Sequence, residues 1–219
     1  MITIHVVNRT PLAKDEEVAA AVAAIQRQVN EHLAPSWGVG GTLVPVLGGA
    51  APPDKAWIIS LLDTSDQPGD IGYHQDTDQP NGMVGVKTCL DDKASWTACL
   101  SHEVMELIVD PWAQLGYQVG EAMYSLEICD PVEGQPYSID NVLVENFVLP
   151  SWFRAGSAGP WDYQKQLSAP LSLLKGGYCQ IANVGDFNQK NGERVRASKL
   201  VPQKLSRRLR RLARKSQGT

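Results

Sequence analysis

Residues 101–111 read Ser-His-Glu-Val-Met-Glu-Leu-Ile-Val-Asp-Pro, and this stretch decides which fold and which chemistry to expect. It lies in a predicted helix that begins at Ser95 and ends at the Asp-Pro pair. At about 100° per residue, His102 and Glu106 lie only about 40° apart, so both side chains can bind one metal ion. Glu103 is placed to take a proton from a water molecule on that ion. The stretch therefore predicts a metal site with a general base beside it.

The same residues allow a simpler interpretation, in which the helix is merely amphipathic. Its solvent-exposed face would then carry His102, Glu103, Glu106 and Asp110. Apolar residues occupy the opposite face, as this interpretation requires: Trp96, Leu100, Val104, Leu107 and Ile108. A short motif arises by chance often enough that the rest of the sequence must decide between the two.

The composition is that of a soluble globular protein of 219 residues, long enough for one domain of two lobes or a domain with a tail. Four cysteines show no Cys-x-x-Cys spacing, and no signal peptide is recognisable, so we expect reduced thiols and a cytoplasmic setting rather than secretion. No apolar run approaches the roughly 20 residues that a membrane-spanning helix needs. We therefore expect no membrane span.

The charge is distributed unevenly along the chain. Residues 194–219 hold 10 of the 20 Lys and Arg residues and none of the 24 Asp and Glu residues. Leu205, Leu209 and Leu212 recur among these basic residues at helical spacing, which predicts a basic amphipathic tail. Such a tail can bind nucleic acid or an acidic partner, or it can be a solvated segment that folds back on the acidic body. Unchanged DNA retention at low salt after deletion of residues 203–219 would exclude nucleic-acid binding.

Hydrophobic patterns predict the remaining elements. Strands are expected at residues 2–7, 42–47, 57–62 and 83–89, with a helix from about residue 15 to 33. Residues 63–81 are predicted to form a long functional loop that includes His74. His74 could shuttle protons or bind product, although an ordinary loop histidine is the commoner case. Further strands are expected at residues 137–139 and 142–148.

Aromatic residues of the second half are expected to serve packing. Trp112, Trp152 and Trp161 are predicted core anchors, because large aromatic side chains mostly fill cores. Tyr124 and Tyr137 are able to stabilise an oxyanion, although a structural hydroxyl is the commoner role.

The predicted order of strand, helix, three strands and motif helix resembles the N-terminal lobe of the zincin metallopeptidases. This resemblance implies an α+β fold with a mixed twisted sheet, a metal-site helix, a smaller irregular second lobe and a basic C-terminal tail. The corresponding domain boundaries are 1–111, 112–200 and 201–219. Zincin substrates pair as an added strand with the edge strand before the metal helix, a role that would fall here to residues 83–89. The usual motif ends in a second histidine, whereas this chain has Glu106, which is still a legitimate zinc ligand.

The gluzincin branch of the zincins also implies where the third ligand lies. There a glutamate some twenty residues further along completes the set, and a following acidic residue supports the first histidine. Glu127 would be this ligand and Asp130 the supporting residue, although the reverse assignment is chemically as good. Asp110 competes with them, but it precedes a proline and is expected to close the helix instead. Zinc is the expected ion, with Mn²⁺ or Ca²⁺ as alternatives because one histidine and two carboxylates form a hard ligand set.

A second resemblance concerns poorly characterised phage-encoded proteins with a Ser-His-Glu-x-x-Glu core. It extends over about half of the chain, from Gly72-Tyr73-His74 through Asp110-Pro111, with Glu127-Ile128-Cys129-Asp130-Pro131. It implies a location in the bacterial host cytoplasm or in the virion.

Three functional hypotheses follow from the sequence. The first is a zinc-dependent hydrolase that cleaves peptides or proteins with Glu103 as general base. The second is a non-enzymatic virion or assembly protein with a degenerate zincin fold, whose residues 194–219 contact DNA or other virion proteins. The third is an ion that only holds the two lobes together.

Overall fold

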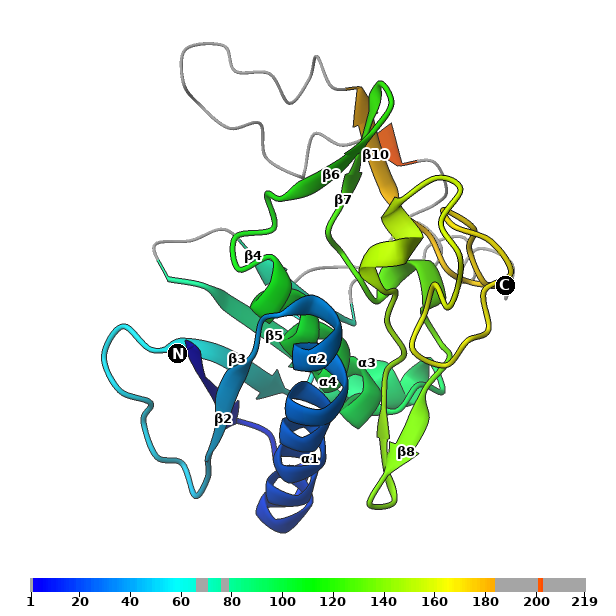
Figure 1. The fold of residues 1–219 in the computed structure, drawn as a ribbon. Coiled ribbons are helices and arrows are strands. Elements are labelled where there is room, and N and C mark those ends of the chain that lie inside the picture. The colour runs from blue at the N-terminus through cyan, green and yellow to red at the C-terminus, as the bar shows by residue number, and fades with distance from the viewer. Residues whose placement is uncertain (1, 66–70, 76–78, 184–200, 203–219) are drawn as a thin grey trace, which may run out of the picture.

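A five-stranded mixed sheet forms one layer of the molecule. The computed structural model describes residues 2–65, 71–75, 79–183 and 201–202. The strands of this sheet are β1 (Ile2–Asn8), β2 (Gly41–Val46), β3 (Trp57–Leu62), β4 (Gly72–Gln75) and β5 (Asn81–Gly85). Their order is β2-β1-β3-β5-β4, and all neighbours are parallel except β4, which pairs antiparallel with β5 (Figure 1). The antiparallel strand β4 therefore forms one edge of the sheet.

Two long helices pack on this sheet. Helix α1 (Asp15–Gln28) continues through a π-helical turn, η1 (Val29–Leu33), into α2 (Ala34–Trp37). It ends at Gly38, whose φ of 70° is favourable for glycine. Helix α1 contacts β1 and β2, whereas α4 (Trp96–Val109) contacts β3, β5 and β4. The short helix α3 (Val86–Asp91) connects β5 to α4.

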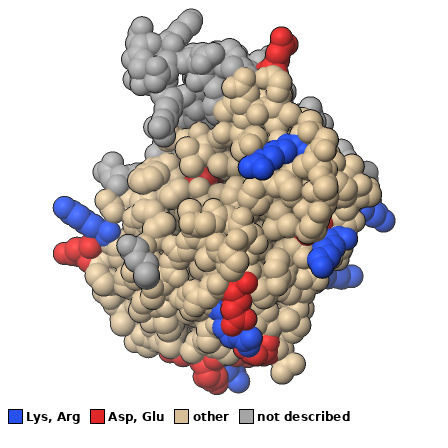
Figure 2. Space-filling view, in the orientation of Figure 1, with Lys and Arg blue, Asp and Glu red and all other residues tan. Residues whose placement is uncertain are grey.

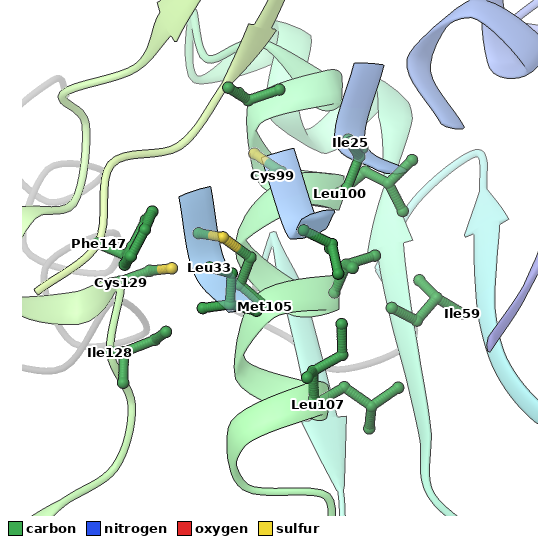
Figure 3. Close-up of a cluster of buried hydrophobic side chains, with 14 of the residues drawn as sticks. Ile25, Leu33, Ile59, Cys99, Leu100, Met105, Leu107, Ile128, Cys129 and Phe147 are labelled. Atoms are coloured by element: carbon green, nitrogen blue, oxygen red, sulfur yellow. The ribbon is translucent and has the colours of Figure 1, made fainter. Parts of the chain in front are cut away.

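The sequence around the start of α4 explains why this helix begins where it does. The Ser95 hydroxyl accepts a hydrogen bond from the backbone N–H of Ala98, which is the usual arrangement at a helix N-cap. All residues from Ala98 to Val109 are buried. Figure 3 shows α4 in the middle of the hydrophobic core, with Ile59 of the sheet on one side and Ile128 and Phe147 on the other. Helix α4 is therefore a central element rather than a surface helix.

The second half of the chain consists of short elements around the other side of α4. A four-stranded sheet has the order β11-β10-β7-β6, and a separate hairpin pairs β8 with β9. These strands are β6 (Gly116–Val119), β7 (Ala122–Ser125), β8 (Tyr137–Ile139), β9 (Val142–Val144), β10 (Gln180–Asn183) and β11 (Val201–Pro202). The 3₁₀ turns are η2 (Asp130–Val132) and η3 (Pro150–Phe153). Strand β9 contacts both α1 and α4, so the hairpin joins the two helices.

Several elements differ from their predictions. Residues 63–81 were expected to be a loop, but they include strand β4. Residues 83–89 were expected to form an edge strand, but β5 ends at Gly85, α3 follows, and β5 lies between β3 and β4. The edge position therefore belongs to β4.

The strand expected at residues 142–148 is also shorter, since β9 ends at Val144. After that point the side chains of Glu145 and Asn146 accept backbone N–H groups of their own segment, which competes with strand pairing. Trp152 is fully buried and Trp161 packs against the core, as predicted. The prediction is wrong for Trp112, which is 45% exposed and contacts the ring of Trp57 edge to face.

The structure has the mixed α/β content and mixed sheet that an α+β assignment requires. Within the described residues, no helix has both the length and the apolar composition needed to cross a membrane. On the face of the molecule shown in Figure 2, most of the surface is formed by uncharged residues, and charged side chains occur singly or in small groups. The predicted basic tail lies outside the described residues, apart from β11.

Candidate metal site

Helix α4 carries the motif residues into the interior of the molecule. The side chains of His102, Glu103 and Glu106 are 2%, 1% and 1% exposed, and the residue Asp110 is 1% exposed. The simpler interpretation, a solvated helix face, is therefore wrong. Burying an ionisable group costs free energy unless hydrogen bonds or opposite charges compensate it, so the neighbours of these side chains determine their state.

His102 is the centre of the first group of contacts. Its Nε2 atom lies 3.0 Å from Oε2 of Glu106, one helical turn further along, and 3.3 Å from Oδ1 of Asp130 in η2. The other carboxylate oxygen of Glu106 accepts a hydrogen bond of 3.1 Å from the backbone N–H of Cys129. Glu106 and Asp130 thus approach the same ring nitrogen of His102.

His74 enters the site from the edge strand β4. Side chains two residues apart in a strand point to the same face, so Gly72 and His74 both face α4. The Glu103 carboxylate packs directly against Gly72. A Cβ atom added at Gly72 would lie only 2.8 Å from Oε1 of Glu103, so a larger residue there would crowd this carboxylate. Nδ1 of His74 lies 3.7 Å from Oε2 of Glu103 and 4.0 Å from Oε2 of Glu106. The interpretation of His74 as an ordinary loop residue is therefore wrong.

The carboxylates around His74 determine its protonation. Burial alone lowers the pKa of His74, but its contact with Glu103 and the charges of Glu106 and Asp110 raise that pKa above the usual value. Nε2 donates a hydrogen bond of 3.0 Å to the backbone carbonyl of Asp110. The imidazole is therefore held between the end of α4 and the acidic side chains.

Glu127, whose side chain is 11% exposed, neighbours the buried carboxyl group of Glu106. Burial raises the pKa of Glu127, and the neighbouring charges of Glu106 and Asp130 raise it further. Burial also acts to raise the pKa of Glu106, but the charge and hydrogen bond of His102 outweigh it, so the pKa of Glu106 is lowered. The pKa values of these two neighbouring carboxyl groups are thus shifted in opposite directions, and a bound cation would lower both.

Asp110 has the structural role expected of a residue before proline. Its two carboxylate oxygens accept hydrogen bonds from the backbone N–H groups of Gln114, at 3.0 Å, and Leu115, at 2.8 Å. Asp110 thereby closes α4 and fixes the chain that follows.

Among the residues that the structure describes, two groups of side chains could hold a metal ion, and both include Glu106. One consists of His102, Glu106 and Cys129, and the other of His74, Glu106 and Glu127. Within each group the potential ligand atoms lie within 4.8 Å of one another. The sequence prediction named four of the residues gathered here, namely His102, Glu106, Glu127 and Asp130, together with Glu103 as the base. It missed His74 and Cys129 as candidate ligands.

A cavity of about 430 Å³ borders the site. Ser95, Ala98, Cys99 and His102 line it from α4, at the spacing of one helix face. Glu145 lines it as well. Its Oε1 atom accepts hydrogen bonds from the backbone N–H groups of Gln135 and Asn146, and burial raises the pKa of Glu145 to about 7. The cavity leads along α4 to His102.

The Tyr137 hydroxyl makes hydrogen bonds that are structural. It accepts a hydrogen bond of 3.1 Å from Nε2 of Gln28 and lies 2.8 Å from Nδ1 of His32. Tyr124 packs edge to face against Trp152.

Comparison with known proteins finds no match, whether with protein-family models, with curated proteins or with solved structures.

Proposed function

We propose that this protein is a metal-dependent hydrolase of zincin-like type that acts on peptides or other amides. In this proposal His102, Glu106 and a third carboxylate, Glu127 or Asp130, hold a divalent ion, and Glu103 is the general base. The observation that carries the proposal is the buried contact of His102 Nε2 with both Glu106 Oε2 and Asp130 Oδ1.

The residues present fit such an ion. Ligand atoms about 2.0–2.1 Å from a tetrahedral zinc ion are about 3.3–3.4 Å apart. The contacts from His102 Nε2 measure 3.0 and 3.3 Å, which is close to that spacing. Imidazole and carboxylate are both zinc ligands, and they also suit other divalent transition metals. Zinc is therefore the proposed ion, with Mn²⁺ or Ca²⁺ as the alternative.

Two contacts of Glu103 support its proposed role as the general base. It neighbours His102 on α4, and its carboxylate occupies the space above Gly72 of β4. A bound divalent ion lowers the pKa of a coordinated water and polarises a carbonyl group. Glu103 would be the base toward such a water, and His74, whose Nδ1 lies 3.7 Å from Oε2 of Glu103, would orient its carboxylate.

The arrangement of elements also supports the proposal. In the zincins that the sequence resembles, the metal helix lies beneath a sheet whose edge strand binds the substrate. Here α4 contacts β3, β5 and β4, and β4 is the antiparallel edge strand. The cavity beside His102 offers space for a substrate side chain.

The test is a substitution that removes the base and leaves the ligands. With added Zn²⁺ and a peptide mixture as substrate, we expect wild-type protein to produce new amino termini. Glu103→Gln should reduce this rate by about 10²–10⁴-fold, the usual contribution of a general base, with unchanged metal content. The exposed Glu121→Gln is the matched control and should retain full activity. Retained activity in Glu103→Gln would exclude this mechanism.

A second candidate is a non-enzymatic protein in which the ion serves only the structure. The observation that favours it is burial, because His102, Glu106 and Asp130 are at most 2% exposed in their side chains. An ion held by these three residues would link α4 to η2. This candidate predicts a melting temperature that falls on addition of a chelator, no such fall in His102→Ala, and no turnover in either protein.

A further inference from the structure

Glu106 lies between two imidazoles that come from different elements. Its Oε2 atom is 3.0 Å from Nε2 of His102 on α4 and 4.0 Å from Nδ1 of His74 on β4. The two histidines belong to separate groups of potential ligands, and Glu106 is the member that these groups share. One carboxylate is therefore positioned to serve two ligand sets.

Each set has further ligands of its own. On the His102 side are the thiol of Cys129, which is fully buried, and Oδ1 of Asp130 at 3.3 Å from His102 Nε2. On the His74 side is Glu127, whose Oε1 lies 3.9 Å from the imidazole of His74. Potential ligand atoms of His74, Glu106 and Glu127, one from each, lie within 4.8 Å of one another. Glu127 and Asp130, the two candidates for the third ligand, thus lie next to different histidines.

The carboxylates of the site outnumber its imidazoles. Four carboxylates surround the two histidines, and the exposed fractions of their side chains are small: 1% for Glu103, 1% for Glu106, 11% for Glu127 and 2% for Asp130. Carboxylate oxygens are common ligands of divalent cations. The site therefore has enough ligands for two positions that share Glu106.

We propose that the chain binds two divalent cations bridged by Glu106. The first ion would be held by His102, Glu106 and Asp130 or Cys129, and the second by His74, Glu106 and Glu127. Paired ions in hydrolytic sites are about 3.5–4 Å apart, a distance that one shared carboxylate can span. The ligands of the second position, one imidazole and two carboxylates, suit Zn²⁺ or Mn²⁺. This inference rests on the ion of the proposed function, but it does not depend on hydrolysis.

Metal stoichiometry tests the proposal directly. The full chain is saturated with Zn²⁺, separated from unbound ions by gel filtration, and analysed for zinc atoms per chain. We expect two in the wild type, one in His74→Ala and one in His102→Ala. His5→Ala removes a histidine of β1 that belongs to neither group, and this control should retain two.

The outcomes separate this inference from the proposed function. One zinc in the wild type, lost in His102→Ala but kept in His74→Ala, overturns the second position and leaves the first intact. No zinc in the wild type overturns both. Glu127→Gln provides a conservative variant in case His74→Ala does not fold, and it should also bind one ion.

Magnetic coupling tests the bridge. After loading with Mn²⁺, the wild type should give the electron paramagnetic resonance spectrum of an exchange-coupled pair, and Glu127→Gln that of an isolated ion. Two bound ions with an uncoupled spectrum would overturn the role of Glu106 as a bridge.

Discussion

At the scale of single residues, Gly72 is the position where the backbone determines the geometry of the site. A Cβ atom there would lie 2.8 Å from Oε1 of Glu103 and 3.1 Å from the carbonyl oxygen of Met83. Gly72→Ala should therefore displace the Glu103 carboxylate and lower the free energy of unfolding by about 1–3 kcal/mol, the usual cost of overpacking. Urea denaturation measures this loss, and the peptide assay should show reduced hydrolysis.

Gly40→Ala is the matched control for this substitution. Its added Cβ would be 3.4 Å from Cβ of Ala34 and 3.8 Å from a methyl group of Val29, which is ordinary packing. We expect its stability and activity to be close to those of the wild type. Equal stability and activity of the two variants would show that the space above Gly72 does not position Glu103.

The residues of the site differ in how well the sequence predicts them. The proximity of His102 and Glu106 follows from helical spacing, since a helix fixes which side chains share a face, whereas Glu103 was named from the motif. His74 was missed because its strand has only four residues and is flanked by polar segments that suggest a loop. A signal was present, however, because the Gly-x-His alternation places a small residue and a histidine on one face of a strand. Cys129 lies between two predicted ligands, but sequence spacing alone does not show which way a residue points in an irregular segment.

At the scale of elements, a buried hydrogen-bond network fixes α4 between α1 and the segment after β9. The Ser101 hydroxyl donates to Oε1 of Gln28, at 2.7 Å, and accepts from the backbone N–H of Glu145, at 3.0 Å. Nε2 of Gln28 donates to the carbonyl of Glu145, at 2.8 Å. Since Ser101 directly precedes His102, this network sets the position of the first predicted ligand.

Ser101→Ala should weaken this connection. The substitution leaves a buried amide oxygen and a buried N–H group without this partner, so we expect the free energy of unfolding to fall by about 1–3 kcal/mol. Ser36→Ala is the control. The Ser36 hydroxyl donates a hydrogen bond to the His32 carbonyl within the same helical turn, which is partly exposed. The effect of this control should stay within about 0.5 kcal/mol. If urea denaturation gives the same midpoint for both variants, the network does not stabilise the position of α4.

The elements that the sequence predicts well are those with a strong internal period. Strand β3 has the predicted bounds, and β1, β2 and α4 differ from prediction by at most one residue at either end. The helix predicted to end at about residue 33 corresponds to α1 and η1 together, because α1 itself ends at Gln28. The edge position of β4 and the interior position of β5 depend on pairing between segments, which a local pattern does not contain. The π-helical turn η1 was not predicted either, because the apolar pattern of residues 15–33 is that of a regular helix.

At the scale of the whole molecule, the buried carboxyl groups make the stability of the metal-free protein depend on pH. A carboxyl group whose pKa is higher in the folded than in the unfolded chain contributes stability that is fully present below the unfolded pKa. This contribution is lost as the pH rises through the folded pKa. Glu145, Glu127 and Asp110 are of this kind, and the raised pKa of His74 acts in the same direction. The lowered pKa of Glu106 acts oppositely, but only as the pH falls below its ordinary value of 4.5.

Glu145 offers the clearest test of this dependence, because its pKa rises from 4.5 to about 7. In chelator-treated protein, we expect the free energy of unfolding to fall between about pH 4.5 and 7, with Glu145 contributing on the order of 3 kcal/mol. Glu145→Gln keeps an oxygen that can accept from Gln135 and Asn146 but cannot ionise, so its stability should fall less steeply. Urea denaturation at pH 5 and pH 8 measures the difference, with the exposed Glu121→Gln as control. An equal loss of unfolding free energy between pH 5 and pH 8 in wild type and Glu145→Gln would contradict a raised pKa at Glu145. The pH dependence would then come from the other groups with raised pKa values, such as Glu127 and His74.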